Sequence, residues 1–179
     1  MSAEEEGLKK RIRNNVALLD EDFVEILPKN STAEFSIDPN GWLKDDCGED
    51  YAHSTKRIDM LFIRRENTTT PTIVIVELKC GCFYAENAFF QLLDYYNFLK
   101  NDDNALACIK ERAKELNLPN AEQWEVKDFK YELWLVVEAK YISRLLKEHW
   151  CYLREDLQKI IRIRHCLVET KAQIIPISK

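Results

Sequence analysis

The length, composition and charge of the chain fit a soluble globular protein. It has 179 residues, of which 46% are hydrophobic and 32% charged, and its formal net charge is −5. This size favours one domain over residues 1–179, and the composition excludes a disordered chain. No run of about 18 apolar residues is present, so we expect no membrane span. The acidic balance argues against a strongly basic nucleic-acid coat.

The cysteine pattern and the first residues indicate an intracellular protein. The six cysteines have no common zinc spacing, and Cys80 and Cys82 form a C-x-C without a second pair. An iron–sulfur cluster would need about four thiolates brought together, and the spacing does not support one. Residues 1–7 are acidic and lack the apolar segment of a secretory signal. We therefore expect reduced thiols and a cytoplasmic, reducing location.

The hydrophobic periodicity predicts helices and strands in an order typical of an α/β fold. A meander of strands that continues into a crossover through a helix predicts a mixed central β-sheet flanked by helices on both faces. In chain order we predict a helix over 8–26, strands over 32–37, 57–64 and 72–79, helices over 84–100 and 105–116, a strand over 130–138, a helix over 143–153, and strands over 160–168 and 173–177.

The most informative segment is residues 73–79, which read Ile-Val-Ile-Val-Glu-Leu-Lys. Four β-branched residues predict a strand buried on both faces. Side chains alternate along a strand, so Glu77 and Lys79 project from one face, roughly 7 Å apart. A charge pair at the end of a buried strand is costly unless something compensates, and a metal ion would do so. The strand predicted over 57–64 carries one further acid, Asp59.

These residue types match the needs of phosphodiester hydrolysis. A divalent ion activates a water, neutralises the phosphoryl group and stabilises the leaving oxygen. Mg²⁺ (or Mn²⁺) prefers oxygen ligands and keeps several waters, so Asp59, Glu77 and the backbone carbonyl of Leu78 would suffice. The ammonium of Lys79 would orient the attacking water or offset developing negative charge.

Three motifs in sequence carry a family resemblance. Residues 57–61 read Arg-Ile-Asp-Met-Leu, residues 76–81 read Val-Glu-Leu-Lys-Cys-Gly, and Gln91 and Tyr95 follow on one helical face. Together they resemble the PD-(D/E)xK nuclease superfamily, and they are closest to the nuclease domain of the NucS/EndoMS-type DNA endonucleases. The Gln-x-x-x-Tyr helix is also similar to that of RecB-like exonucleases.

The resemblance implies a restriction-endonuclease-like core with a motif region over 57–100 and a helical insertion over about 101–128. It implies that Asp59 and Glu77 bind the metal and that Lys79 is catalytic. It also implies that Gln91 supports the site. The NucS-type enzymes carry a separate N-terminal DNA-binding and dimerisation domain. Only about 55 residues precede the motifs in this sequence, so mismatch specificity is not transferred.

Further residues are assigned by the same resemblance. Arg57 and Tyr95 are candidates for substrate binding. Family members often add an acid from the first helix, for which Glu25 is the candidate and Glu21 and Glu34 are its rivals. The expected function is a Mg²⁺- or Mn²⁺-dependent DNA endonuclease in defence, repair or mobile-element biology, acting as a homodimer or with a partner that supplies target recognition.

Other interpretations stay open at this level. Glu77 with Lys79 could be a solvent-facing ion pair of little energetic value, and Asp59 could cap a strand or pair with Arg57. The aromatic residues of 84–100 could pack in the core or stack on bases. Two other functions also stay open. The chain could be a catalytically silent binding module for nucleic acid or protein on a nuclease fold, or it could be a nuclease that acts on RNA.

Overall fold

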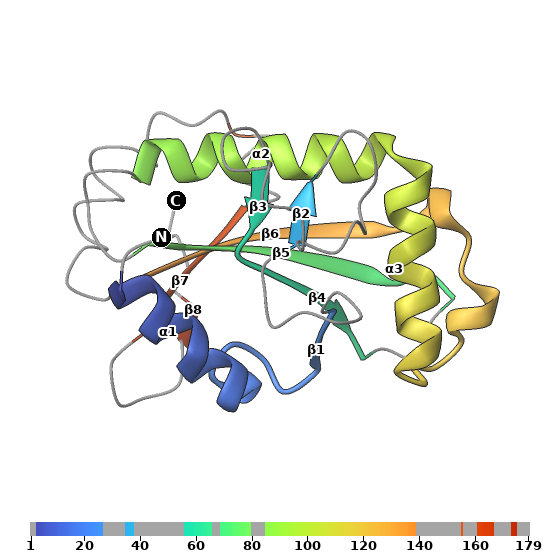
Figure 1. Cartoon of the computed structure of the whole chain (residues 1–179), viewed down its shortest axis with the longest axis horizontal. Helices are drawn as coiled ribbons and strands as arrows, with labels where there is room; N and C mark the ends of the chain where they lie inside the picture. The colour runs from blue at the N-terminus through green and yellow to red at the C-terminus, as the bar shows by residue number, and fades with distance from the viewer. Residues whose placement is uncertain are drawn as a thin grey trace, which may run out of the picture.

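The computed structural model describes residues 3–26, 35–37, 56–65, 69–79, 85–138, 155, 161–166 and 173–174. The helix predicted over 143–153 lies outside the described residues. In the described part the fold is α/β, with a mixed sheet and helices packed on both of its faces (Figure 1). The α/β class and the mixed sheet that the sequence predicted are therefore confirmed.

Six strands form the main sheet in the order β1-β4-β5-β6-β7-β8. Strand β5 pairs antiparallel with β4 and parallel with β6, and β6 pairs parallel with β7. Strands β2 and β3 form a separate antiparallel pair. The strands span Phe23–Glu25 (β1), Phe35–Ile37 (β2), Lys56–Ile58 (β3), Met60–Arg64 (β4), Thr72–Lys79 (β5), Lys130–Glu138 (β6), Ile161–Cys166 (β7) and Gln173–Ile174 (β8).

Strand β5 lies between β4 and β6 and is buried on both faces, as the sequence predicted. Its residues from Thr72 to Leu78 are all buried, and Lys79 at its end is half-buried. The β-branched residues Ile73 to Val76 suit this position because their side chains pack well on a pleated surface.

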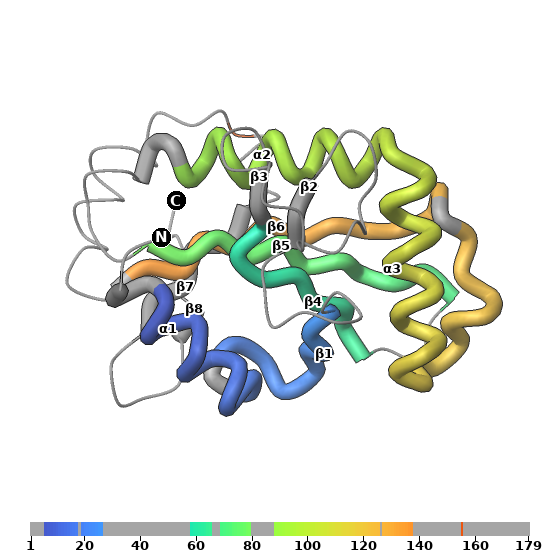
Figure 2. The backbone as a smooth tube through the Cα atoms, viewed as in Figure 1, coloured from blue at the N-terminus to red at the C-terminus, as the bar shows by residue number. Residues whose placement is uncertain are grey.

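Two apolar layers cover the sheet. Helices α2 (Ala85–Asn101) and α3 (Asp103–Glu115) pack on one face, and α1 (Ala3–Asn14) packs on the other (Figure 1). After β5 the chain returns along the sheet in α2 and then turns into α3 (Figure 2). Side chains of β4, β5 and β6 alternate between the α2 layer, with Leu61, Ile63, Ile73, Ile75, Leu133 and Leu135, and the α1 layer, with Met60, Phe62, Val74, Val76, Trp134 and Val136.

The segment predicted as a helical insertion packs into the α2 layer. Asp102 caps α3, since its side chain accepts hydrogen bonds from the backbone N of Asn104 and of Ala105, both at 3.0 Å. Two short 3₁₀ helices, η2 (Ala121–Gln123) and η3 (Val126–Asp128), lead on to β6.

The predicted helix over 8–26 is wrong beyond Asn14. The chain forms a 3₁₀ turn at Val16–Leu18 (η1) and then strand β1, which pairs with β4. The apolar spacing in this stretch fits a helix, but the backbone N of Ile26 instead donates to the O of Leu61 at 2.8 Å. Hydrogen bonds to the exposed edge of β4 outweigh the local helical pattern, because propensity is a weak preference.

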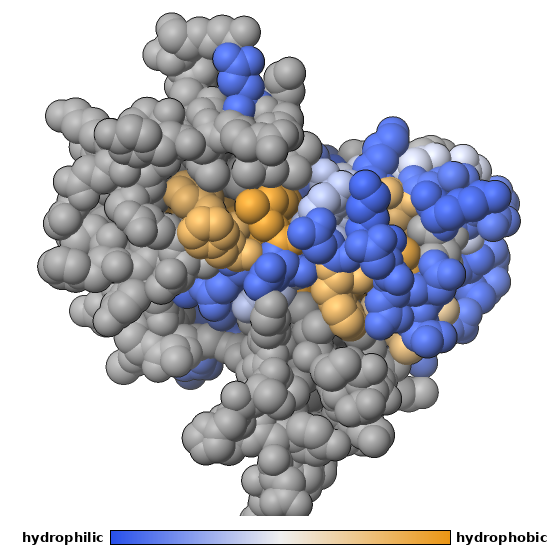
Figure 3. Space-filling model, turned by 90° about the horizontal axis from the view of Figure 1, so that it is seen from above, coloured by the Kyte–Doolittle hydropathy of each residue, from blue (hydrophilic) through white to orange (hydrophobic). Residues whose placement is uncertain are grey.

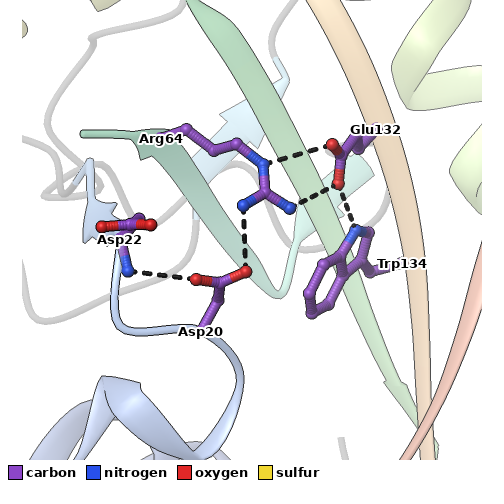
Figure 4. A network of polar contacts seen from close by, with 5 residues as sticks. All are labelled: Asp20, Asp22, Arg64, Glu132 and Trp134. Atoms are coloured by element: carbon purple, nitrogen blue, oxygen red, sulfur yellow. Dashed lines mark hydrogen bonds and ion pairs between the residues drawn. The ribbon is translucent and has the colours of Figure 1, made fainter. Parts of the chain in front are cut away.

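A network around Arg64 ties the sheet to the segment before β1 (Figure 4). The guanidinium of Arg64 contacts Asp20 at 2.9 Å and Glu132 of β6 at 3.0 Å. It also lies 4.8 Å from the ring centroid of Phe23, and the indole Nε1 of Trp134 donates to Glu132 Oε2 at 2.9 Å. One cation therefore joins β4, β6 and the entry to β1 across the central strand.

We predict that Arg64→Met lowers the free energy of unfolding by about 2 kcal/mol, because two half-buried carboxylates lose charged hydrogen bonds. The control is Arg112→Met, which removes a surface ion pair with Glu115 on α3 and should cost less than about 0.5 kcal/mol. Urea denaturation of both variants measures the difference. Equal losses would contradict a special role for the Arg64 network.

Candidate functional site

A fork in the sheet creates the candidate site. Pairing of β4 with β5 ends at Met60 opposite Val76, although β5 continues to Lys79. The chain bends at Asp59, and β3 pairs with β2 at a steep angle to the sheet on its α2 side (Figure 1). The strand predicted over 57–64 is therefore two strands, divided at the acid that the sequence singled out.

Asp59 binds the edge of β5 at this fork. Its Oδ2 accepts a hydrogen bond from the backbone N of Leu78 at 2.8 Å, and the residue is only 9% exposed. The carboxylate thus takes the place that a backbone carbonyl of β4 would hold if the two strands stayed paired. A charge-assisted bond of this kind is about twice as strong as a neutral one, so Asp59 fixes the bend to the central strand.

Glu77 and Lys79 form a buried ion pair beside Asp59. The Nζ of Lys79 donates to Oε1 of Glu77 at 2.6 Å. The side chain of Glu77 is 2% exposed and that of Lys79 is 15% exposed. The interpretation as a solvent-facing pair is therefore wrong, because water is largely excluded from the carboxylate.

Strand alternation places this pair on the α2 face of the sheet. Ile73 and Ile75 belong to the α2 layer, so Glu77 and Lys79 follow them on the same face. The shared face is what the sequence predicted. In a strand the N–H and the C=O of one residue point toward the same neighbour. The carbonyl of Leu78 therefore lies on the edge that Asp59 occupies.

The donor atoms at the fork suit a hard divalent cation. They are carboxylate oxygens of Asp59 and Glu77 together with the carbonyl oxygen of Leu78, the ligand type that Mg²⁺ and Mn²⁺ prefer. Within the described residues no group of three or more His, Cys, Asp or Glu side chains gathers. Two carboxylates and one carbonyl oxygen would leave the other positions around Mg²⁺ or Mn²⁺ to water.

Glu25 lies elsewhere. It follows Phe23 on β1, and Phe23 belongs to the α1 layer, so Glu25 is on the face opposite Glu77. Its Oε1 accepts from Nε of Arg13 on α1 at 2.9 Å. The structure therefore does not bring Glu25 to the fork. Of its two rivals, Glu21 is exposed in the turn before β1, and Glu34 is outside the described residues.

Helix α2 covers the face of β5 that carries the pair. Tyr95 is buried in the α2 layer, and Gln91 is half-buried one turn earlier. A buried phenol cannot meet a polymer that approaches from solvent, so Tyr95 fits a supporting position better than a substrate contact. Arg57 lies on β3, two residues before Asp59, and only its backbone is described.

The aromatic residues of α2 divide into packed and exposed ones. Phe89 and Tyr95 are buried in the α2 layer, as the core-packing interpretation requires. Phe90 is 68% exposed, the one large hydrophobic side chain in the described part that is strongly exposed. Among the coloured residues on this side of the molecule, apolar areas lie between hydrophilic ones (Figure 3).

Helix α1 carries a buried cation that the sequence did not predict. Lys9 is buried beside Leu8 and Ile12, and its charge acts on Glu25 together with that of Arg13. Lys9 lies next to the apolar stripe of α1 in the sequence. This position predicts burial only weakly, because the charged end of a lysine there usually extends into solvent.

Comparisons of the chain with models of protein families, with curated proteins and with solved structures gave no match. None of the helices in the described part is both long enough and apolar enough to span a membrane.

We predict a distinct pH dependence of stability from Glu25. Burial raises the pKa of its carboxyl above the ordinary 4.5, although the hydrogen bond from Arg13 and the charges of Arg13 and Lys9 lower it. An acid with a raised pKa in the folded state stabilises the fold fully below its unfolded pKa, and this contribution is lost as the pH rises through the folded pKa.

The stability advantage of wild type over Glu25→Gln should therefore shrink as the pH rises from about 4 to about 7. Urea denaturation of both proteins across this range measures the difference in unfolding free energy. A difference that stays constant or grows with pH would contradict the raised pKa of Glu25.

Proposed function

We propose that this chain is a metal-dependent DNA endonuclease with a restriction-endonuclease-like core of the PD-(D/E)xK type. The observation that carries the proposal is the meeting of Asp59, Glu77 and Lys79 at the fork of β4 and β5, with both acids buried. An α/β fold with a mixed sheet and helices on both faces is compatible with such a core.

The carboxylates of Asp59 and Glu77, with the carbonyl of Leu78, would hold Mg²⁺ or Mn²⁺. A bound ion supplies charge neutralisation and an activated water to phosphodiester hydrolysis. Burial strengthens every electrostatic interaction at the fork because the effective dielectric is lower than in water. Strand β5 holds these groups rigidly, since it is paired on both sides and packed on both faces.

Lys79 supplies the cation of the site. Lys79 is the last residue of β5. Its side chain contacts the buried carboxylate of Glu77 and is itself partly exposed to solvent. Its ammonium carries three hydrogen-bond donors on a flexible stem, so it can orient an attacking water or meet a phosphate oxygen. Asp59 positions the strand end by its bond to the N–H of Leu78.

DNA is the proposed substrate, in defence, repair or mobile-element biology. The net charge of −5 means that phosphates must be met by the metal and by local cations such as Lys79. A homodimer would place two such sites across a duplex, and a separate partner could supply target recognition. RNA would undergo the same chemistry, so it is the second substrate to test.

A catalytically silent binding module on the same fold is the second candidate. The direct contact between Lys79 and Glu77 favours it, because a closed ion pair can serve as a purely structural element. In that case DNA or protein binding would persist without metal and without Lys79.

We predict that plasmid and single-stranded DNA are cut with Mg²⁺ or Mn²⁺ but not with EDTA, and that Lys79→Ala slows cutting by about 100-fold or more. The control is Lys114→Ala, whose lysine pairs with Glu111 and Glu122 on the surface away from the fork. Opening of circular plasmid distinguishes an endonuclease from an exonuclease. Full activity of folded Lys79→Ala would refute the proposed role.

Asp59→Asn separates the structural and chemical roles of Asp59. The amide oxygen can still accept from the N–H of Leu78, so we expect the free energy of unfolding to change by less than about 1 kcal/mol. Cutting should be lost because a neutral amide is a poor ligand for a hard cation. Thermal denaturation and the plasmid assay give the two readouts, and unchanged cutting would exclude Asp59 as a metal ligand.

A further inference from the structure

The ion pair at the end of β5 joins two groups with different degrees of burial. Glu77 is almost fully buried, and its Oε2 is also shielded from solvent. Its Oε1 accepts from Nζ of Lys79 at 2.6 Å. A carboxylate in such surroundings must be neutralised, because an uncompensated buried charge is strongly destabilising. Lys79 is a cation in direct contact with this carboxylate.

A divalent ion and the ammonium of Lys79 would compete for this carboxylate. Both are cations, and two cations in contact with one oxygen repel each other strongly in a buried setting. Either can neutralise Glu77, but they cannot hold Oε1 together at contact distance. An ammonium on Oε1 opposes a metal ion at either oxygen of Glu77, and movement of the ammonium away from Oε1 relieves that repulsion.

We infer that Lys79 is a displaceable counter-ion of Glu77, which keeps the metal affinity low and is released toward the substrate when the metal binds. This inference rests on the proposed function, because it assumes a metal at Glu77. Metal binding at Glu77 and movement of the Lys79 ammonium toward the substrate are then one exchange.

The position of Lys79 suits such an exchange. It ends β5, and its side chain is more exposed than that of Glu77, so the ammonium has a path to solvent. The flexible stem of lysine allows this movement with little change in the backbone. Asp59 stays bonded to the N–H of Leu78 between the two residues, so the strand end keeps its place.

The inference is tested by isothermal titration calorimetry with Mn²⁺ alone. Lys79→Met keeps an unbranched, flexible stem and removes the ammonium with its charge, so the dissociation constant for Mn²⁺ should fall by about tenfold or more. Lys79→Arg keeps a cation beside Glu77 and should stay close to wild type. The control is Lys114→Met, which likewise takes a lysine away from surface glutamates and should leave Mn²⁺ binding unchanged.

Thermal denaturation followed by circular dichroism covers the case in which Lys79→Met folds poorly. Mn²⁺ should then restore the folded signal of the variant, or raise its midpoint by more than it raises that of wild type. A Lys79→Met protein that does not respond to Mn²⁺ while wild type does would overturn the inference.

The remaining outcomes separate this inference from the proposed function. Equal Mn²⁺ affinity of wild type and Lys79→Met would overturn the exchange and leave the metal site standing. No Mn²⁺ binding by either protein would overturn the proposed metal-dependent nuclease, and the exchange with it.

Discussion

Strand β5 is buried on both faces, and each layer of the fold packs against it. Its apolar residues alternate between the α2 layer and the α1 layer, and β4 and β6 occupy its two edges. Each fully buried aliphatic side chain contributes roughly 1.5–3 kcal/mol, so the buried residues of this strand stabilise both layers. The same burial makes the charges at its end costly, and the local structure is arranged to offset that cost.

The ion pairs of the described part differ between the two faces of the sheet. On the α1 face, Arg64 and Arg13 contact carboxylates from other elements and so join strands to helix and loop. These pairs link distant segments and fit a structural role. On the α2 face, Glu77 pairs with Lys79, which lies only two residues away on the same strand.

The bend at Asp59 links the fold to this pair. Continued pairing of β4 along β5 would fill the edge beside Glu77 and Lys79 with backbone. The bend instead directs β3 to β2 and brings a carboxylate to the N–H of Leu78. One side chain thereby satisfies the backbone of the central strand and adds a second buried acid next to Glu77. Stability and the proposed chemistry depend on the same residue.

The sequence by itself determined that 72–79 is a buried strand and that Glu77 and Lys79 share a face, because alternation is a property of any strand. Its prediction of a helix through Phe23–Glu25 was wrong, since the short apolar spacing fits both a helix and a strand until the edge of β4 is available. It also could not place Glu25 opposite the fork or divide 57–64 at Asp59. Those features depend on which strand edges meet, and only the tertiary structure brings together residues that lie so far apart in the chain.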